Sequence, residues 1–263
     1  MKRLSLILGI MTMGILASCS TDEFDPDVTT DTTEDAKLNL KGVYVKRIVT
    51  TTNAGSTVNT SDYLYSGSKL ARINSSDGTH VIYVYTGNLI TGRDFYYNNV
   101  LNSREIFEYD TNSQLLNYRR TNPAGTVLYK AIYQYNSDGT VTVSGYRGGT
   151  ISESTKIVNR KVFVVNSQVT KIENYTISNG SAVTEVLNYS FDTKNSPFKD
   201  ILGFDKLTYY DTALNGSARN VTGITTVGAS LANSGNDIVQ YTYNAQNYPV
   251  TANKGSIVFQ YSY

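Results

Sequence analysis

Residues 132–145 read IYQYNSDGTVTVSG, and this arrangement of an aromatic pair, a polar turn and a second apolar run returns along the chain. Alternate side chains of a β-strand point to opposite faces. Tyr133 and Tyr135 therefore share one face, and Gln134 takes the other. The Asn-Ser-Asp-Gly sequence that follows is typical of a tight turn between antiparallel strands. The stretch predicts a β-hairpin with one aromatic face.

The same unit recurs often enough to predict the whole fold. Comparable segments begin at Asp62, Val81, Phe95, Ile106, Val162, Leu187, Val239 and Phe259. Strands repeating about every 10 to 13 residues indicate about 14 to 16 strands in sequential antiparallel pairs. A sheet of this size curls. We therefore expect an all-β fold with a large curved antiparallel meander sheet, open or partly closed like a barrel.

Little helix is expected, because long helix-forming stretches are scarce. The one candidate is residues 198–207, FKDILGFDKL, where apolar residues fall at helical spacing for about two turns. This stretch predicts a short helix or a structured loop.

The aromatic face is expected to line the inside of the curve, where large rings bury the most area. Tyrosines outnumber phenylalanines, which suggests contact with water, since a buried phenol needs a hydrogen-bond partner. Such a face can stack on a sugar or a peptide, although the absence of tryptophan weakens the sugar interpretation. The alternative is that the rings only build the core. The candidate binding residues are Tyr83, Tyr85, Tyr133, Tyr135, Tyr241 and Tyr243.

The chain begins with the features of an exported protein. Residues 1–18, MKRLSLILGIMTMGILAS, have a basic start, an apolar run and small residues at the end, as in a signal peptide. The apolar run is shorter than the ~20 residues that span a bilayer. Cys19 follows at once and is the only cysteine, so no internal disulfide, thiolate metal site or cysteine nucleophile is available.

Two further regions follow the signal. Residues 19–37 carry seven acidic residues and one lysine, a net charge of −6. With almost nothing apolar to bury, they are expected to form a disordered tether. Residues 38–263 carry a dispersed net charge of +5 and are expected to form a single β-meander domain. Dispersed charge argues against a nucleic-acid partner.

Several of these motifs resemble those of known bacterial proteins. Leu16-Ala17-Ser18-Cys19 resembles a lipobox, which implies lipidation of Cys19, and the acidic residues behind it resemble the surface-export signal of Bacteroidota lipoproteins. The Tyr-x-Tyr units look like degenerate YD repeats of RHS-type proteins, although their lengths vary and the chain is too short to enclose a large cargo. The whole arrangement resembles Bacteroidota outer-membrane lipoproteins of unknown function with a porin-like β-meander.

This resemblance implies a place in the cell envelope. We expect a protein anchored in the outer membrane through the lipid on Cys19 and displayed at the cell surface, with the periplasmic face as the alternative. Asp31-Thr32-Thr33 and Asp211-Thr212-Ala213 resemble bacterial O-glycosylation acceptors, which makes Thr32 and Thr212 candidate glycan sites.

Catalytic residues are not evident in the sequence. His80 is the only histidine, and a catalytic triad would need Asp77 or Asp94 behind it without any nucleophile motif. Candidate carboxylates for glycoside hydrolysis lie in strand-like segments where a solvent-facing acid is ordinary: Glu105, Glu108, Glu153, Glu173 and Glu185. The Asp-Gly pairs at 77–78 and 138–139 are explained as hairpin turns without calcium.

The sequence therefore predicts no catalytic residue, no metal and no cofactor. We expect a non-enzymatic binding or structural module whose partner is an envelope protein or an extracellular glycan or peptide. The alternatives are a glycan-active hydrolase and a periplasm-facing envelope-assembly factor.

Overall fold

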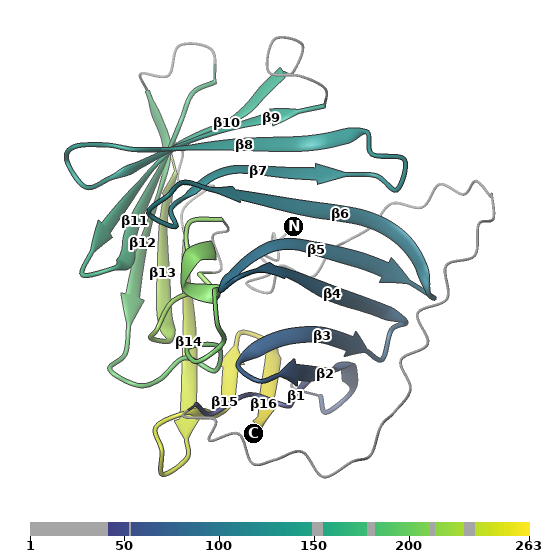
Figure 1. Cartoon of the computed structure of the whole chain (residues 1–263). Coiled ribbons are helices and arrows are strands. Elements are labelled where there is room, and N and C mark those ends of the chain that lie inside the picture. Colours follow the sequence, from purple (N-terminus) through teal and green to yellow (C-terminus); the bar gives the residue numbers. More distant parts are fainter. Residues whose placement is uncertain (1–41, 53, 149–154, 178–181, 211–213, 229–234) are drawn as a thin grey trace.

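The computed structural model describes residues 42–52, 54–148, 155–177, 182–210, 214–228 and 235–263. These residues form one closed antiparallel barrel in which consecutive strands pair and the last strand pairs with the first (Figure 1). The strands are β1 (Arg47–Thr52), β2 (Thr57–Ser66), β3 (Lys69–Ser75), β4 (Thr79–Thr86), β5 (Leu89–Tyr97), β6 (Val100–Tyr109), β7 (Leu115–Thr121), β8 (Val127–Tyr135), β9 (Val141–Arg147), β10 (Thr155–Val165), β11 (Gln168–Tyr175), β12 (Val183–Phe191), β13 (Val221–Gly228), β14 (Gly235–Tyr243), β15 (Pro249–Lys254) and β16 (Ile257–Ser262). The predicted all-β meander is confirmed, and the sheet is closed.

The hairpin that begins at Ile132 forms as its sequence predicts. Strands β8 and β9 pair from Tyr135 and Val141 onward. In the turn, Gly139 takes a φ of 79°, a conformation that glycine adopts without a steric penalty. The carboxylate of Asp138 accepts a hydrogen bond from the backbone N–H of Thr140 at 3.0 Å. Local turn chemistry therefore sets the register of this pair of strands.

The Tyr-x-Tyr pattern sorts side chains between the inside and the outside of the barrel. The paired aromatic residues belong to the core or pack against it: Tyr63/Tyr65, Tyr83/Tyr85, Phe107/Tyr109, Tyr133/Tyr135 and Tyr189/Phe191. The residues between the members of these pairs are all exposed: Leu64, Val84, Glu108, Gln134 and Ser190. The aromatic residues therefore line the interior.

Hydroxyl groups of several inner tyrosines donate to backbone carbonyl oxygens of residues that lie 14 to 20 positions earlier in the chain. The pairs are Tyr65 with Val45 at 2.8 Å, Tyr109 with Ile90 at 2.8 Å, Tyr135 with Leu115 at 3.2 Å, Tyr241 with Val221 at 3.1 Å and Tyr263 with Pro249 at 2.9 Å. Ile90 and Leu115 lie where the pairing of β4 with β5 and of β6 with β7 shifts register, and such bulges disrupt the strand ladder locally. At these positions tyrosine is favoured over phenylalanine because its hydroxyl donates to a backbone carbonyl, not because it contacts water.

A long connection between β12 and β13, residues 192–220, folds into the barrel; we call its described residues the inner segment. It contains the 3₁₀ helix η1 (Phe204–Leu207), which falls within the stretch predicted as a short helix or structured loop. Figure 1 shows this green segment within the ring of strands. Its rings reach the opposite wall: Phe198 lies 6.1 Å from Tyr63 and Phe204 lies 6.0 Å from Tyr83, between ring centroids.

The two ends of the barrel differ because the strands simply alternate in direction. Connections that follow even-numbered strands, including the inner segment, lie at one end together with the start of β1 and the end of β16. We call this end the plug end. There, the backbone N–H of Leu202 donates to the carbonyl oxygen of Ser68 in the β2–β3 turn at 3.0 Å. The N–H of Val43 donates to the inner segment's Asp200 at 3.0 Å. Connections that follow odd-numbered strands lie at the far end.

Candidate functional site

A buried ion pair joins the inner segment to the barrel wall. Arg93 on β5 donates through Nε to Glu105 Oε2 on β6 at 2.8 Å. The hydroxyls of Tyr118 on β7 and Tyr210 of the inner segment donate to Glu105 Oε1 at 2.8 and 2.6 Å. The Arg93 guanidinium also lies 5.0 Å from the centre of the Tyr210 ring. A buried pair of this kind fixes geometry because both charges have hydrogen-bond partners.

The position of Glu105 corrects the expectation of a solvent-facing acid. Glu105 is 6% exposed and points inward. Glu185 also points inward, because it shares its face of β12 with Leu187 and Tyr189, which pack in or against the core. The physical reason is strand alternation: Glu105 shares its face with Phe107 and Tyr109, two and four residues later. That parity was the signal available in the sequence.

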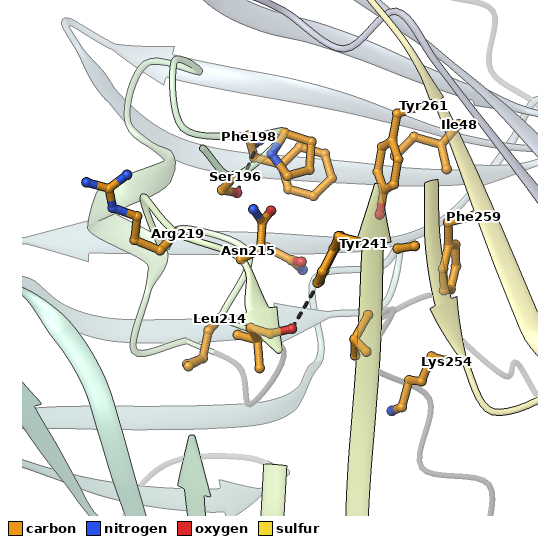
Figure 2. Close-up of a pocket in the computed structure, with 15 residues that line it drawn as sticks. Ile48, Ser196, Phe198, Leu214, Asn215, Arg219, Tyr241, Lys254, Phe259 and Tyr261 are labelled. Atoms are coloured by element: carbon orange, nitrogen blue, oxygen red, sulfur yellow. Dashed lines mark hydrogen bonds between the residues drawn. The ribbon is translucent and has the colours of Figure 1, made fainter. Parts of the chain in front are cut away.

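A cavity of about 80 Å³ lies between the inner segment and strands β1, β14, β15 and β16. In Figure 2, Tyr241, Phe259 and Tyr261 stand along one side of it and Phe198 and Asn215 along the other. A water molecule needs about 10–15 Å³ by this kind of measure. The cavity therefore has room for several waters or one small ligand.

The lining is mainly apolar and aromatic, with a few polar groups. The Tyr241 hydroxyl donates a hydrogen bond to the Val221 carbonyl oxygen at 3.1 Å. Asn220 is 3% exposed and donates through Nδ2 to Asp192 at 2.9 Å, while its Oδ1 is buried without a hydrogen-bond partner among the described residues. Lys254 pairs with Asp237 at 3.1 Å, and burial lowers the pKa of Lys254. A small apolar ligand with one or two hydrogen-bonding groups fits this chemistry.

The six candidate binding tyrosines do not form one free surface. Tyr83 packs on Phe204, the Tyr85 hydroxyl donates to the Leu202 carbonyl at 3.3 Å, and Tyr133 is 3% exposed. The Tyr135 ring meets Tyr209 edge to face, and the Tyr243 hydroxyl donates to Asp192. Tyr241 alone of the six lines the cavity. The sequence could not indicate this, because the inner segment that covers the other rings carries no strand-like pattern.

His80 lies on the outer wall rather than in the interior. Its ring stacks on Tyr96 with centroids 4.6 Å apart. Burial lowers the pKa of His80, and the positive charge of Arg72 lowers it further. The two aspartates considered as partners are engaged elsewhere, since Asp77 accepts from Thr79 at 2.9 Å and Asp94 pairs with Arg104 at 3.4 Å.

The remaining candidate residues divide between the outer wall and positions outside the described ranges. Glu108 pairs with Arg119, and Glu173 pairs with Lys171 at 2.7 Å, both on the outer wall. Within the described ranges, no three acidic, histidine or cysteine side chains gather as metal ligands. Cys19, Thr32, Glu153, Thr212 and the segments 1–18 and 19–37 lie outside the described residues.

Across the described ranges, no helix is long and apolar enough to cross a bilayer.

Fold and site together define a plugged antiparallel β-barrel with an aromatic interior. The chain matches no protein-family model, and no curated protein is detectably similar to it in sequence. The solved structures that are similar to it include two that are described as porin-like proteins. The one from Bacteroides uniformis ATCC 8492 has 10% identity and a TM-score of 0.36, with 83% of this chain and 96% of that chain covered. The one from Bacteroides vulgatus ATCC 8482 has 12% identity and a TM-score of 0.41, with 84% and 99% covered.

Proposed function

We propose that this protein is a non-enzymatic binding barrel that stands in water and is held at the outer membrane by a lipid on Cys19. Its ligand is a small, mainly apolar molecule that occupies the cavity beside the inner segment. The observation that carries the proposal is the distribution of charge between the two faces of the wall.

The outer wall carries ion pairs between neighbouring strands, between a strand and a turn, and within one strand. They are Arg47–Asp62 at 2.6 Å, Asp94–Arg104 at 3.4 Å, Glu108–Arg119, Lys161–Asp138 at 2.8 Å and Lys171–Glu173 at 2.7 Å. Outward apolar residues are interrupted by charges: Ile82 lies opposite Asp94, and Ile106 lies opposite Arg119. A barrel that spans a membrane instead has an apolar outer band about 25 Å tall, in which a central Arg or Lys costs about 2–4 kcal/mol. The pattern supports a barrel surrounded by water.

The interior supports the same conclusion. A water-filled channel has an open polar lumen, whereas much of this interior is filled by a packed core that includes Phe107, Tyr118, Val162 and Ile172 and the rings of the inner segment. Passage of solutes through the barrel is therefore not the function that we propose. The cavity beside Tyr241 and Tyr261 offers room for a small ligand.

Attachment through Cys19 rests on the lipobox-like sequence alone. Because the chain enters the barrel at the plug end, that end lies nearer the anchor along the chain and the far end is left for contact with other molecules. Cell-surface display remains part of the proposal, with the periplasmic face as its alternative.

Fractionation of the full chain tests the anchored, water-exposed barrel. The wild type should partition with the outer membrane, whereas Cys19→Ala should remain soluble without detergent and keep a β-sheet circular-dichroism spectrum. A Cys19→Ala protein that still needs detergent, or whose strands become protease-resistant on addition of lipid vesicles, would show that the barrel wall itself enters the bilayer. Proteinase added to intact cells then separates surface display from the periplasmic face.

Native mass spectrometry tests the ligand. Ala252 lines the cavity and is 1% exposed, so Ala252→Phe places a ring in the cavity. We expect a small molecule on wild-type protein purified from its host and none on the variant. Equal amounts of bound molecule on the two proteins would show that the ligand does not occupy the cavity.

A further inference from the structure

A row of inner side chains crosses strands β5 to β9. The register pairs Arg93 with Glu105, Glu105 with Arg120, Arg120 with Tyr129, and Tyr129 with Arg147. Directly opposite residues of antiparallel strands share a face. All five therefore point into the barrel, on a part of the wall separate from the cavity beside Tyr241.

Arg160 on β10 joins this row from the next strand. It lies opposite Val143, an inner residue that is 4% exposed. The Tyr129 side chain leans toward β10 over Gly145, where a Cβ would overlap the Tyr129 hydroxyl oxygen and lie 2.7 Å from Val158 Cβ. Burial raises the pKa of Tyr129, and the positive charge of Arg160 opposes that rise. Tyr129 is thus the centre around which Arg120, Arg147 and Arg160 are placed.

These three arginines lack acidic partners. The Nε atoms of Arg120 and Arg160 are buried without a hydrogen-bond partner. Throughout the described ranges, no carboxylate forms an ion pair with Arg120, Arg147 or Arg160. Arg120 and Arg160 are half-buried, and an unpaired guanidinium shielded from water is unfavourable, whereas Arg147 is exposed at the end of β9. The row therefore carries uncompensated positive charge, which a bound anion would neutralise.

The two inner acids near the row are already engaged. Glu105 accepts from Arg93 on one oxygen and from Tyr118 and Tyr210 on the other. Glu185 accepts from Asn174 Nδ2 at 2.8 Å, and Asn174 lies between Glu185 and Arg160 in the register. Neither acid balances the three arginines.

We propose that Arg120, Arg147, Arg160 and the Tyr129 hydroxyl form a site for an oxyanion, namely the phosphoryl or carboxyl group of a ligand that enters from the far end. Arg120 and Arg147 lie near the far-end termini of β7 and β9, whereas Arg160 lies deeper along β10. Guanidinium groups bind such oxygens through paired N–H donors. This site is independent of the cavity and of the ligand proposed for it.

Calorimetric titration of the purified full chain tests the site. Sodium phosphate and sodium acetate are added at low millimolar concentration against sodium chloride of the same ionic strength. We expect saturable binding of phosphate or acetate and a higher Tm in its presence. Phosphate binding without acetate binding assigns a phosphoryl group, and the reverse assigns a carboxyl group. Absence of saturable binding for both anions would overturn the proposal.

Two inner variants and one outer variant test whether the binding is specific to the proposed site. Arg120→Gln and Arg160→Gln should each weaken the binding by about tenfold or more, as expected for loss of a charge-assisted hydrogen bond. Arg104→Gln removes the same charge from the outer wall and should leave the affinity unchanged. Equal weakening in all three variants would mean general charge attraction and would contradict the proposal.

A stability measurement separates binding from a purely structural role. Without phosphate or acetate, Arg160→Gln should be at least as stable as the wild type, because it removes an unpaired cation. With the bound anion, the wild type should gain a higher Tm and the variant should not. If the Tm of the variant lies below that of the wild type by the same amount with and without the anion, Arg160 only supports packing.

Discussion

The hydroxyl of Tyr109 on β6 donates to the carbonyl oxygen of Ile90 on β5 at 2.8 Å, nineteen positions earlier in the chain. Ile90 lies at the register shift between β4 and β5. One side chain of a repeat therefore completes the backbone hydrogen bonding of the preceding hairpin. This relationship explains why the repeat uses tyrosine where phenylalanine would pack equally well.

Removing this hydroxyl should destabilise the barrel. Tyr109→Phe leaves a shielded carbonyl without a donor, which costs about 1–3 kcal/mol. Tyr63→Phe is the matched control, since the Tyr63 ring packs on Phe198 and its hydroxyl has no hydrogen-bond partner among the described residues. We expect the control to change the free energy of unfolding by less than about 0.5 kcal/mol. Urea unfolding measures both, and equal losses would contradict this role of the phenol.

The ion pair between Arg93 and Glu105 should show strong coupling. Glu105→Leu leaves the Arg93 guanidinium, whose side chain is 16% exposed, without its carboxylate, and loss of one partner of such a pair costs about 3–5 kcal/mol. Arg93→Met combined with Glu105→Leu should recover most of that loss. Unfolding free energies of both single variants and the double variant measure the coupling. Additive effects would show that the two charges act independently.

The inner segment lies close to the wall at Gly203. Gly203 has a φ of 80°, and a Cβ there would lie 2.9 Å from the Asn88 carbonyl oxygen and 3.2 Å from the Ile90 nitrogen. Gly67 has a φ of 60° but no atom within 4 Å of its Cβ position. Gly203→Ala should therefore lower Tm more than Gly67→Ala, which meets only the backbone strain of about 1–2 kcal/mol. Equal decreases in Tm would mean that the inner segment can move away from the wall without an energetic cost.

Alkaline pH should unfold the protein cooperatively. Burial raises the pKa of Tyr65, Tyr109 and Tyr135, and the hydrogen bond to Glu173 raises the pKa of Tyr175 to about 12. In the unfolded chain, tyrosine titrates near pH ~10. The stability from these groups is fully present below that pH and is lost as the pH rises towards their folded pKa values, by at most about 1.4 kcal/mol per pH unit for the more deeply buried Tyr65 and Tyr109. Tyrosinate absorbance should rise together with loss of β-sheet signal; a gradual rise in folded protein would contradict this expectation.

The strands were predictable because their signal is local. Tyr133 and Tyr135 share a face by alternation, and the Asp-Gly turn at 138–139 closes the hairpin through neighbouring residues. Closure was not predictable, since the pairing of β1 with β16 joins Arg47 to Ser262 and depends on the accumulated twist and stagger of all the strands.

The site was less predictable because it depends on the inner segment. Residues 198–207 have helical spacing, yet their sequence does not say that Phe198 and Phe204 enter a barrel. The parity of Glu105 with Phe107 could have indicated an inward acid, although we expected a solvent-facing one; its partner Arg93 comes from another strand and Tyr210 from the inner segment. Contacts between segments far apart in sequence need the register of the whole sheet.

The order of strands also has a consequence for folding. Every pair of neighbours from β1 to β16 is joined by a connection in the sequence except β1 and β16 themselves. Loop-closure entropy makes such a distant pairing slower to form than hairpins, so the sheet can be almost complete while two edges remain unpaired. Exposed edges invite pairing with other chains. Loss of β16 by truncation should thus turn the closed barrel into an open sheet that aggregates, so the six residues of β16 protect the protein against aggregation.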